Sequence, residues 1–122
     1  MFWDGVEIKK VFLGNLVFTN DWNLMKKLYI GLMSGTSMDA VDAVLVDFSQ
    51  NKPQLLHTYK LPLASTLRED LTQLYTEDAI KIAKLAELDQ KIALVSVQAV
   101  NKLLEKSDLV AKDILAIGSH GQ

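Results

Sequence analysis

A run of small, hydroxyl-bearing residues between two apolar segments is the part of this sequence best suited to chemistry. It lies within Gly31-Leu-Met-Ser-Gly-Thr-Ser-Met-Asp-Ala-Val-Asp42. Gly35 permits a positive φ angle or close approach of a ligand to the backbone. Thr36 and Ser37 offer hydroxyl donors, and consecutive backbone amides in such a loop can form a nest for an anion. The pattern favours a cradle for phosphate groups, while a plain hairpin turn capped by Asp39 explains the same residues.

Two carboxylates accompany this loop. Asp39 and Asp42 could hold a magnesium ion directly or through water, because Mg²⁺ prefers oxygen ligands and keeps part of its hydration shell. The loop is not a Walker A motif, since no Gly-Lys-Ser/Thr follows the glycines, and it is not a dinucleotide-binding fingerprint. A site for phosphate and Mg²⁺ at this loop is therefore an expectation from residue chemistry alone.

A second polar cluster ends the sequence, at Gly118-Ser-His-Gly-Gln122 after an apolar segment. Ligands of open α/β sheets bind at strand ends, so the position suits a binding residue. His120 could donate a hydrogen bond to a sugar or a phosphate, or act in acid–base chemistry. Gln122 could hydrogen-bond a polar substrate. The alternative is a polar turn without a ligand.

Two other polar residues lie within apolar surroundings. Asp89 falls on the helical stripe that Leu85 and Ile92 define, where a carboxylate must be paired or reach solvent to avoid a desolvation cost. We favour a position at the edge of the stripe that reaches solvent. His57 lies between Leu56 and Thr58 in an expected strand, and we assign it no role.

The apolar pattern predicts the elements that must position these residues. Short apolar runs bounded by turn-forming residues predict strands, and longer runs with a period near 3.6 predict helices. Ser65 or Thr66 is expected to cap the first helix, and Asp108 is expected to break or cap the second. The predicted strands cover residues 28–33, 43–48, 54–61 and 114–117, and the predicted helices cover residues 67–75 and 79–106.

The order of these elements predicts an α/β fold. The first three strands are joined by connections too short for a crossover helix, so they form an antiparallel meander. The fourth strand returns after a long helix and is expected to run parallel to the strand that it joins. The result is a mixed sheet with helices packed on it. The apolar face of the long helix is expected to contain Ile82, Leu85, Ile92, Ala99 and Leu103.

Composition excludes several classes of protein. The chain has 122 residues, 49% of them hydrophobic and 23% charged, and a formal net charge of −2, so it has the composition of one small globular domain. That charge gives no polybasic footprint for nucleic acid or an anionic membrane, and no apolar run reaches the ~20 residues of a membrane span. The sequence contains no cysteine, which removes thiolate metal sites and fits a reducing compartment.

The first residues differ from the rest. Residues 1–24 contain only short, interrupted apolar runs, and Met25 directly precedes the first convincing strand. We expect residues 1–24 to be an extension outside the core, and residues 25–122 to form the domain.

The two polar clusters together resemble a known family. The segment from Tyr29 to Asp42 and the segment Ala116-Ile-Gly-Ser-His-Gly-Gln122 are similar to two signatures of anhydro-N-acetylmuramic acid kinases, in the same order. The likeness covers residues 25–122. Position 40 is alanine, where the family usually has glycine. No Asp-x-Gly-Pro-Gly motif of the family's catalytic aspartate is present, so the chain resembles an N-terminal fragment of the first lobe.

The resemblance implies a partial actin-like ATPase subdomain from a kinase of peptidoglycan recycling. Such a kinase uses ATP and water to convert 1,6-anhydro-N-acetylmuramic acid to N-acetylmuramic acid 6-phosphate. ATP and Mg²⁺ are the implied cofactors, an amino sugar is the implied small-molecule partner, and the implied location is the cytoplasm. Neither nucleic acid nor a membrane is an expected partner, and a homo-oligomer of the full-length form is a further arrangement to test. The implied ATP site is Gly35, Thr36, Ser37, Met38, Asp39, Ala40, Val41 and Asp42, with Asp39 and Asp42 as metal ligands, and the implied substrate site is His120, Gly121 and Gln122.

The fragment itself carries no residue that we assign as catalytic, and we expect it to be inactive alone. The alternative is a non-catalytic module, a remnant that binds phosphate or a nucleotide without transferring it.

Overall fold

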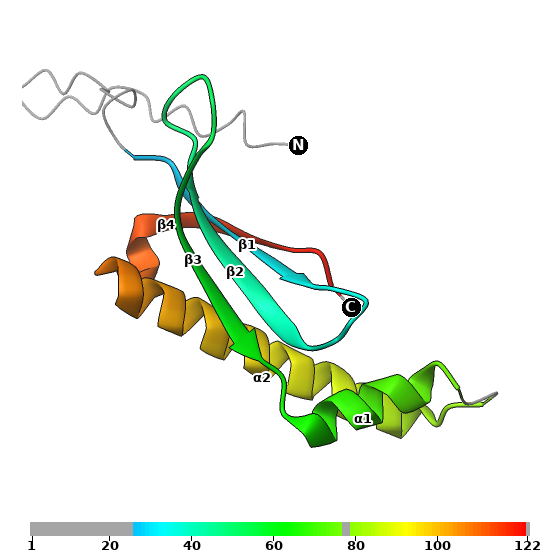
Figure 1. Ribbon diagram of the computed structural model, residues 1–122. Coiled ribbons are helices and arrows are strands. Elements are labelled where there is room, and N and C mark those ends of the chain that lie inside the picture. The colour runs from blue at the N-terminus through cyan, green and yellow to red at the C-terminus, as the bar shows by residue number, and fades with distance from the viewer. Residues whose placement is uncertain (1–25, 77–78, 122) are drawn as a thin grey trace, which may run out of the picture.

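The computed structural model describes residues 26–76 and 79–121. They form an α/β fold, with one mixed β-sheet and helices beside it (Figure 1). The elements are β1 (Leu28–Ser34), β2 (Ala40–Asp47), β3 (Gln54–Pro62), α1 (Ser65–Leu74), α2 (Ile82–Ser107), a 3₁₀ turn (Ala111–Asp113) and β4 (Ile114–Ser119). The sheet order is β3-β2-β1-β4. The strands β1, β2 and β3 pair antiparallel, and β4 pairs parallel to β1, as the sequence predicts.

Alternation along the strands sorts their side chains onto two faces. In β1, Leu28, Ile30 and Leu32 are buried. Ile30 stands opposite Leu45 of β2, so these side chains share a face. The intervening residues Tyr29 and Gly31 lie on the other face. A strand alternates with period two, so the apolar residues at even positions of β1 define the core face.

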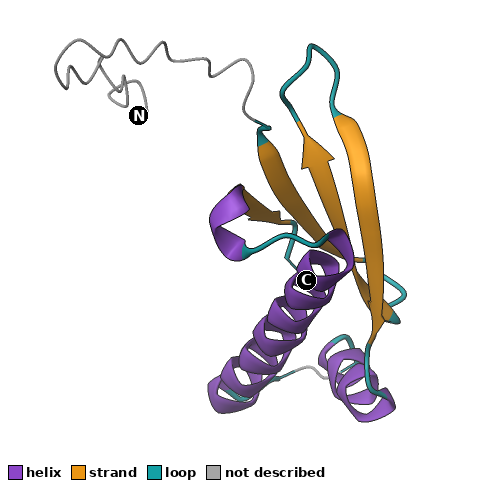
Figure 2. Ribbon diagram, turned by 90° about the vertical axis from the view of Figure 1, so that its left-hand side faces the viewer, coloured by secondary structure: helices purple, strands orange, loops and turns teal. Residues whose placement is uncertain are grey.

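The helix α2 covers the core face of β2 and β3. Figure 2 shows α2 crossing one side of the sheet, whereas the opposite side carries no helix of the described residues. The largest fully buried side chains are Ile30, Val41 and Leu45 of the sheet and Leu88 and Leu103 of α2. They belong to the core, which other buried residues of the strands and of both helices complete.

The apolar stripe expected on α2 is fully buried only in its C-terminal part. Ala99 and Leu103 are fully buried, but Ile82 is 85% exposed and Leu85 is 52% exposed. The first turns of α2 lie beside α1 rather than against the strands (Figure 1). The periodicity marks the apolar face of the helix, but the sheet determines how much of that face is covered.

The predicted N-terminal cap of α1 is wrong. The helix begins at Ser65 itself, and the N-cap position is Ala64, which makes no side-chain cap hydrogen bond. Neither Ser65 nor Thr66 therefore occupies the capping position. The C-terminal prediction for α2 is confirmed, because Asp108 is its C-cap in a left-handed conformation with φ of 54°. Aspartate tolerates this region better than most residues other than glycine.

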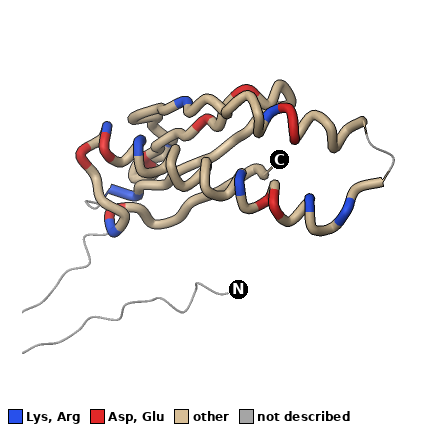
Figure 3. Tube along the Cα trace, turned by 90° about the horizontal axis from the view of Figure 1, so that it is seen from below, with Lys and Arg blue, Asp and Glu red and all other residues tan. Residues whose placement is uncertain are grey.

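Ion pairs connect α1 to α2. Asp70 of α1 lies 3.2 Å from the Lys84 ammonium and 3.5 Å from that of Lys91, and Glu87 pairs with Lys91 at 2.6 Å. The hydrogen bond and charge of Lys84 lower the pKa of Asp70. Basic and acidic positions alternate over the molecule instead of forming one patch (Figure 3).

No helix of residues 26–76 and 79–121 is both long and apolar enough to cross a membrane. The expectation that residues 1–24 lie outside the core concerns residues outside the described ranges.

Candidate functional site

The hydroxyl-bearing loop forms the connection between β1 and β2. The amide of Met38 donates to the Gly35 carbonyl over 2.9 Å, so residues 35–38 form a β-turn. This confirms the predicted turn. Thr36 and Ser37, its two central residues, are exposed. The loop can therefore present their hydroxyl groups to a ligand.

The positive φ angle of this loop is not at Gly35. Met38 has φ of 48°, whereas the φ of Gly35 lies outside the left-handed region. A Cβ atom added to Gly35 would meet only the Ser37 hydroxyl, at 3.9 Å. Neither backbone strain nor steric contact within the described residues therefore requires glycine at position 35. Met38 is buried, so its packing against the core offsets the cost of this conformation.

The Asp39 carboxylate is the most strongly held polar group of the loop. The Ser37 hydroxyl donates to its Oδ1 over 2.6 Å, and the Lys60 ammonium lies 3.3 Å from its Oδ2. These two hydrogen bonds, from Ser37 first and Lys60 second, lower the pKa of Asp39. The carboxylate is therefore ionised at neutral pH and oriented by both partners.

Lys60 is the residue of this site that sequence reasoning missed. It lies on β3 directly opposite Asp42 of β2, so both side chains leave the same face of the sheet. The Lys60 ammonium pairs with the Asp39 carboxylate and extends from the same face of the sheet as Asp42. The sequence alone did not indicate this residue, because its place beside the loop depends on the register of β2 and β3.

Three residues of the predicted ATP site belong to β2 rather than to the loop. Ala40, Val41 and Asp42 are strand residues. Ala40 and Val41 are buried, with 1% and 2% exposure, so their side chains cannot line an open phosphate site. Asp42 is exposed. The part of the predicted site that is open to a ligand is Gly35–Ser37 with Asp39 and Asp42.

The second polar cluster lies at the same end of the sheet. Ser119 of β4 stands opposite Leu32 of β1, and the amide of His120 donates to the Leu32 carbonyl over 3.0 Å. The parallel strands β1 and β4 therefore end side by side, and the loop after β1 adjoins the turn after β4. His120 is exposed. Gln122 lies outside the described residues.

Gly121 is the one described glycine with a positive φ angle, 79°. Its amide donates to the Ser119 hydroxyl over 3.3 Å. An L-residue at position 121 would be strained by this backbone conformation. The conformation makes glycine the favoured residue here, where the sequence alone indicated only a polar turn.

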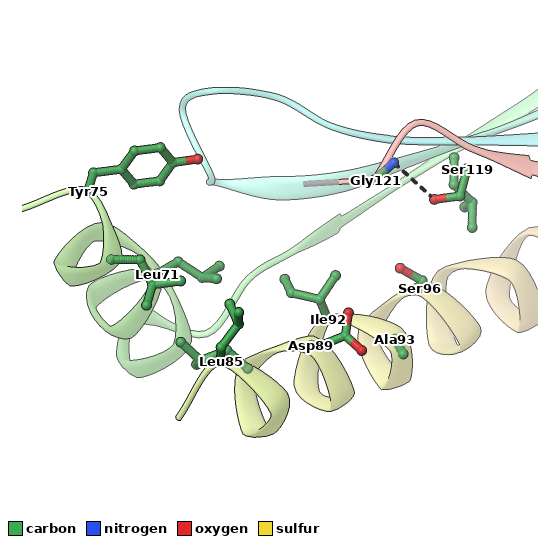
Figure 4. A pocket seen from close by; sticks show the side chains of 12 residues that line it. Leu71, Tyr75, Leu85, Asp89, Ile92, Ala93, Ser96, Ser119 and Gly121 are labelled. Carbon is green, nitrogen blue, oxygen red and sulfur yellow. Dashed lines mark hydrogen bonds between the residues drawn. The ribbon is translucent and has the colours of Figure 1, made fainter. Parts of the chain in front are cut away.

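A crevice of about 510 Å³ opens beneath this end of the sheet, between α1, α2 and the ends of β1 and β4 (Figure 4). Its walls are mainly apolar, and Tyr75, Asp89, Ser96 and Ser119 contribute polar side chains. Asp89 is exposed, which confirms its expected position at the edge of the stripe. His57 is half-buried on β3, away from both polar clusters.

Ser34, at the end of β1, is another residue that sequence reasoning missed. Its hydroxyl oxygen is buried and has no hydrogen-bond partner among residues 26–76 and 79–121. It lines a small cavity of about 20 Å³ together with Ser96 and Ser119. The turn-forming residues in the sequence indicated only that the strand ends at Ser34. The burial of the Ser34 hydroxyl depends on the position of α2.

The loop fits Mg²⁺ only in part. Asp39 and Asp42 supply the carboxylate oxygens that Mg²⁺ prefers, and magnesium sites commonly use one or two carboxylates with substrate phosphates. Oδ2 of Asp39, however, already faces the Lys60 ammonium, so a cation there competes with Lys60. Within the described ranges, no group of three or more His, Cys, Asp or Glu side chains is arranged to hold a metal ion. Asp42 is also exposed, and it makes no ion pair within the described residues.

These features define an α/β domain with a hydroxyl-bearing loop and a polar turn at the adjoining ends of two parallel strands, where open α/β sheets bind ligands. Comparison with known proteins identifies the kind of domain. The sequence profile of the family "Anhydro-N-acetylmuramic acid kinase" matches residues 27–122, and the chain belongs to this family.

Curated relatives support the assignment. An anhydro-N-acetylmuramic acid kinase of Mannheimia succiniciproducens is 41% identical over 99 residues, which cover 81% of this chain and 26% of the relative. Those of Shewanella sp. (strain ANA-3) and Shewanella denitrificans are 48% and 50% identical over 97 and 94 residues, covering 80% and 77% of this chain. The matched segment is 26% and 25% of those two relatives. The chain therefore spans about a quarter of the length of the relatives it matches.

Proposed function

We propose that this chain forms the N-terminal part of a cytoplasmic kinase that converts 1,6-anhydro-N-acetylmuramic acid to N-acetylmuramic acid 6-phosphate with ATP and water. Family membership and the names of the relatives support this reaction. The observation that carries the proposal is the adjoining position of the two polar clusters, joined by the hydrogen bond from His120 to Leu32. A phosphate site and a sugar site must be adjacent for a phosphoryl group to be transferred from one ligand to the other.

In this proposal the loop binds phosphate. The Thr36 and Ser37 hydroxyl groups and the amides of the turn would donate to phosphate oxygens, and the Lys60 ammonium would balance their negative charge. Asp42, with Asp39, would hold Mg²⁺ through water and phosphate oxygens. ATP, when bound, supplies the phosphoryl group. These groups come from the loop between β1 and β2, from β2 and from β3, which the pairing of the three strands holds side by side.

The turn after β4 is proposed to contact the sugar. The family resemblance assigns this role to His120, Gly121 and Gln122. The imidazole of His120 is exposed at the end of the sheet where the loop between β1 and β2 lies. The positive φ angle of Gly121 allows the chain to turn sharply there. The turn thus offers hydrogen-bonding groups beside the loop that binds phosphate.

The isolated chain is expected to bind phosphate weakly and to transfer none. Phosphoryl transfer needs a group that positions or deprotonates the attacking water or hydroxyl, within about 3 Å of it. It also needs the phosphates to be enclosed and their charge to be stabilised from more than one side. The described residues supply one open loop and one edge of a sugar site.

The test is a titration of the isotope-labelled chain with Mg²⁺–ATP, followed by amide chemical shifts in NMR spectra. We expect the largest shifts at residues 34–39, and these should weaken in Ser37→Ala. The matched control is Thr72→Ala, which removes an exposed hydroxyl on α1 that bonds to the Arg68 carbonyl. Tripolyphosphate should reproduce the loop shifts if phosphate is the recognised group. Shifts confined to other regions, or none at millimolar nucleotide, would contradict the proposal.

A second measurement addresses activity. Purified chain with Mg²⁺–ATP and 1,6-anhydro-N-acetylmuramic acid should produce no phosphorylated sugar. Turnover that persists in clean preparations and disappears in Asp39→Asn would show that the loop carries the chemistry itself.

A further inference from the structure

Both oxygens of the Asp39 carboxylate are engaged by side chains of the chain itself. Oδ1 accepts the Ser37 hydroxyl over 2.6 Å, and Oδ2 lies 3.3 Å from the Lys60 ammonium. These are the same two donors that the proposed phosphate site would use. A carboxylate and a phosphate present the same kind of anionic oxygen to such donors, so Asp39 stands where a phosphate oxygen would be recognised.

The two donors differ in how many hydrogen bonds they can make. A serine hydroxyl has one proton to donate, whereas a lysine ammonium has three. Ser37 can therefore donate to a phosphate oxygen only when it leaves Asp39. Lys60 can share its protons, but a phosphate of higher charge attracts the ammonium more strongly than a single carboxylate does. A phosphate ligand and Asp39 thus compete for the same two side chains.

Backbone pairing fixes the places of these side chains but leaves their ends free to change partners. Lys60 stands opposite Asp42 in the pairing of β2 with β3. The Leu63 amide donates to the Asp39 carbonyl over 2.8 Å. The side chains of Lys60 and Asp39 are nevertheless 57% and 48% exposed, and an exposed ion pair costs little to break. The partners can therefore change without a movement of the strands.

The same pair limits the binding of a metal ion. Among residues 26–76 and 79–121, Lys60 is the one cation paired with Asp39. A divalent cation at Asp39 would be repelled by this ammonium and would compete with it for Oδ2. Asp42 would then be left as a single carboxylate ligand. Removal of Lys60 from Asp39 is therefore the step that makes both carboxylates available together.

We propose that Asp39 is an internal substitute for phosphate, and that Ser37 and Lys60 leave it for the phosphate group of a ligand. The released carboxylate then becomes available, with Asp42, to hold Mg²⁺. The loop thus favours phosphate and metal together over either one alone, and this coupling is reciprocal. The inference rests on the proposed phosphate and metal site and adds the exchange that couples its two ligands.

The experiment uses the 122-residue chain, with tripolyphosphate and Mn²⁺ as separate probes. Mn²⁺ takes the same carboxylate ligands as Mg²⁺, and its paramagnetism broadens the NMR signals of nearby amides. Asp39→Asn removes the internal anion, and Lys60→Gln removes the cation that holds it. The controls are Glu105→Gln and Lys102→Gln, which remove the same charges from an exposed ion pair of 2.8 Å on α2. These controls measure the effect of net charge alone.

We expect Asp39→Asn to strengthen the binding of tripolyphosphate without metal by about threefold relative to Glu105→Gln, as the loss of an exposed competing pair would. Mg²⁺ should increase the affinity of the parent chain and of Glu105→Gln for tripolyphosphate. It should not do so for Asp39→Asn, which lacks the carboxylate that the exchange releases.

Lys60→Gln should have opposite effects on the two probes. Binding of Mn²⁺ alone should become about threefold stronger than in Lys102→Gln, and binding of metal-free tripolyphosphate should become weaker. Lys60→Arg should behave like the parent chain, because it keeps the positive charge. The gain in Mn²⁺ binding should disappear when Lys60→Gln is combined with Asp39→Asn.

Three results would overturn the proposal. One is binding of metal-free tripolyphosphate that is no stronger in Asp39→Asn than in Glu105→Gln. Another is Mn²⁺ binding that Lys60→Gln changes no more than Lys102→Gln does. The third is a gain in Mn²⁺ binding that persists in the double variant. No binding of tripolyphosphate by any variant would overturn the proposed function as well, whereas binding with equal affinity would overturn the exchange alone.

Discussion

The two faces of the sheet differ in what covers them, although the same strands build both. On the covered face, Ala43 and Leu45 of β2 are 0% and 1% exposed beneath α2. On the uncovered face, Val44 and Val46 of the same strand are half-buried, and Met33 of β1 is 53% exposed. Adjacent residues of one strand thus differ in burial because only one face has a helix above it.

The covered face should therefore contribute mainly to stability, and the uncovered face remains available for interaction. The covered face contains the side chains that lose all contact with water on folding, and their burial is the main favourable contribution to stability. The uncovered face retains apolar area that folding of these residues alone does not bury. Substitutions on the two faces should therefore have effects of different size, and the following predictions test that expectation.

The largest effect is expected on the covered face. Leu45→Ala should lower the free energy of unfolding by about 2–5 kcal/mol, because it removes buried methylene groups and leaves a cavity. The matched control is Leu55→Ala on β3, which should cost about 0.5 kcal/mol or less because that side chain is exposed. Urea denaturation of both variants measures the difference. Similar values for the two leucines would mean that α2 does not cover β2 in solution.

A smaller effect is expected for the polar group at the end of the covered face. Asp47 is 8% exposed, and its carboxylate accepts hydrogen bonds from the Ser49 amide at 2.8 Å, the Ser49 hydroxyl and the Lys27 amide at 3.3 Å. Asp47→Ala removes these hydrogen bonds, although the Lys27 amide still donates to the Ser49 hydroxyl oxygen over 2.9 Å. We expect a lower Tm, with a decrease smaller than that of Leu45→Ala.

The same carboxylate should make stability depend on pH. Hydrogen bonds from Ser49 lower the pKa of Asp47 in the folded state, so the unfolded chain binds a proton at higher pH than the folded chain. The stabilisation is therefore complete above the unfolded pKa of about 3.9 and is lost as pH falls through the folded value. Tm measured between pH 6 and 2 should fall less steeply in Asp47→Asn. An unchanged profile would exclude Asp47 as a source of acid sensitivity.

On the uncovered face, Val44→Ala should lower the free energy of unfolding by about 1 kcal/mol or less, because a half-buried valine contributes only part of its transfer free energy. Val44 stands opposite Gly31 of β1, where an added Cβ would lie 3.1 Å from the Val44 Cγ2 atom. Thermal unfolding of this variant beside Leu45→Ala gives the direct comparison of two neighbouring residues. A cost as large as that of Leu45→Ala would show that the uncovered face is packed by something in solution.

The smallest effect is expected at the exposed loop. The Ser37 hydroxyl and the Lys60 ammonium lower the pKa of Asp39, so its contribution is present above the unfolded pKa and is lost at lower pH. Because the pair with Lys60 is exposed, salt should screen it. Asp39→Asn should change Tm slightly at low ionic strength and not at 1 M NaCl. A large loss at high salt would mean that the carboxylate supports the fold rather than a ligand.

Most of the fold follows from short-range patterns in the sequence. The alternation in the strands and the short connections between them predict the antiparallel meander, and the long helix before the last strand predicts its parallel return. The errors lie where a pattern does not specify a neighbour. A cap of α1 at Ser65 or Thr66 is the favoured prediction, but the helix begins one residue after Ala64, because hydroxyl residues are favoured at a cap without being required there.

The candidate site, like the fold, could be predicted only in part from the sequence. The types of residue in Gly35–Asp39 and at His120 are enough to indicate ligand-binding chemistry. They do not reveal that Ala40 and Val41 belong to a strand, because a run of small residues does not show where a loop ends. Lys60 escapes prediction because its proximity to Asp39 depends on the register of β2 and β3.

The sequence by itself determined the order of the elements, the residues on each strand face and the two polar clusters, because these depend on backbone geometry and spacing over a few residues. The tertiary structure decided which face became the core, which edge remained open and which groups meet. Those outcomes depend on contacts between residues far apart in the chain: α2 crosses one face of the sheet, Lys106 reaches Thr58 on β3, and β4 pairs with β1 so that His120 lies beside the end of the hairpin. The local sequence does not predict these contacts, because each depends on packing that forms only when the whole sheet is assembled.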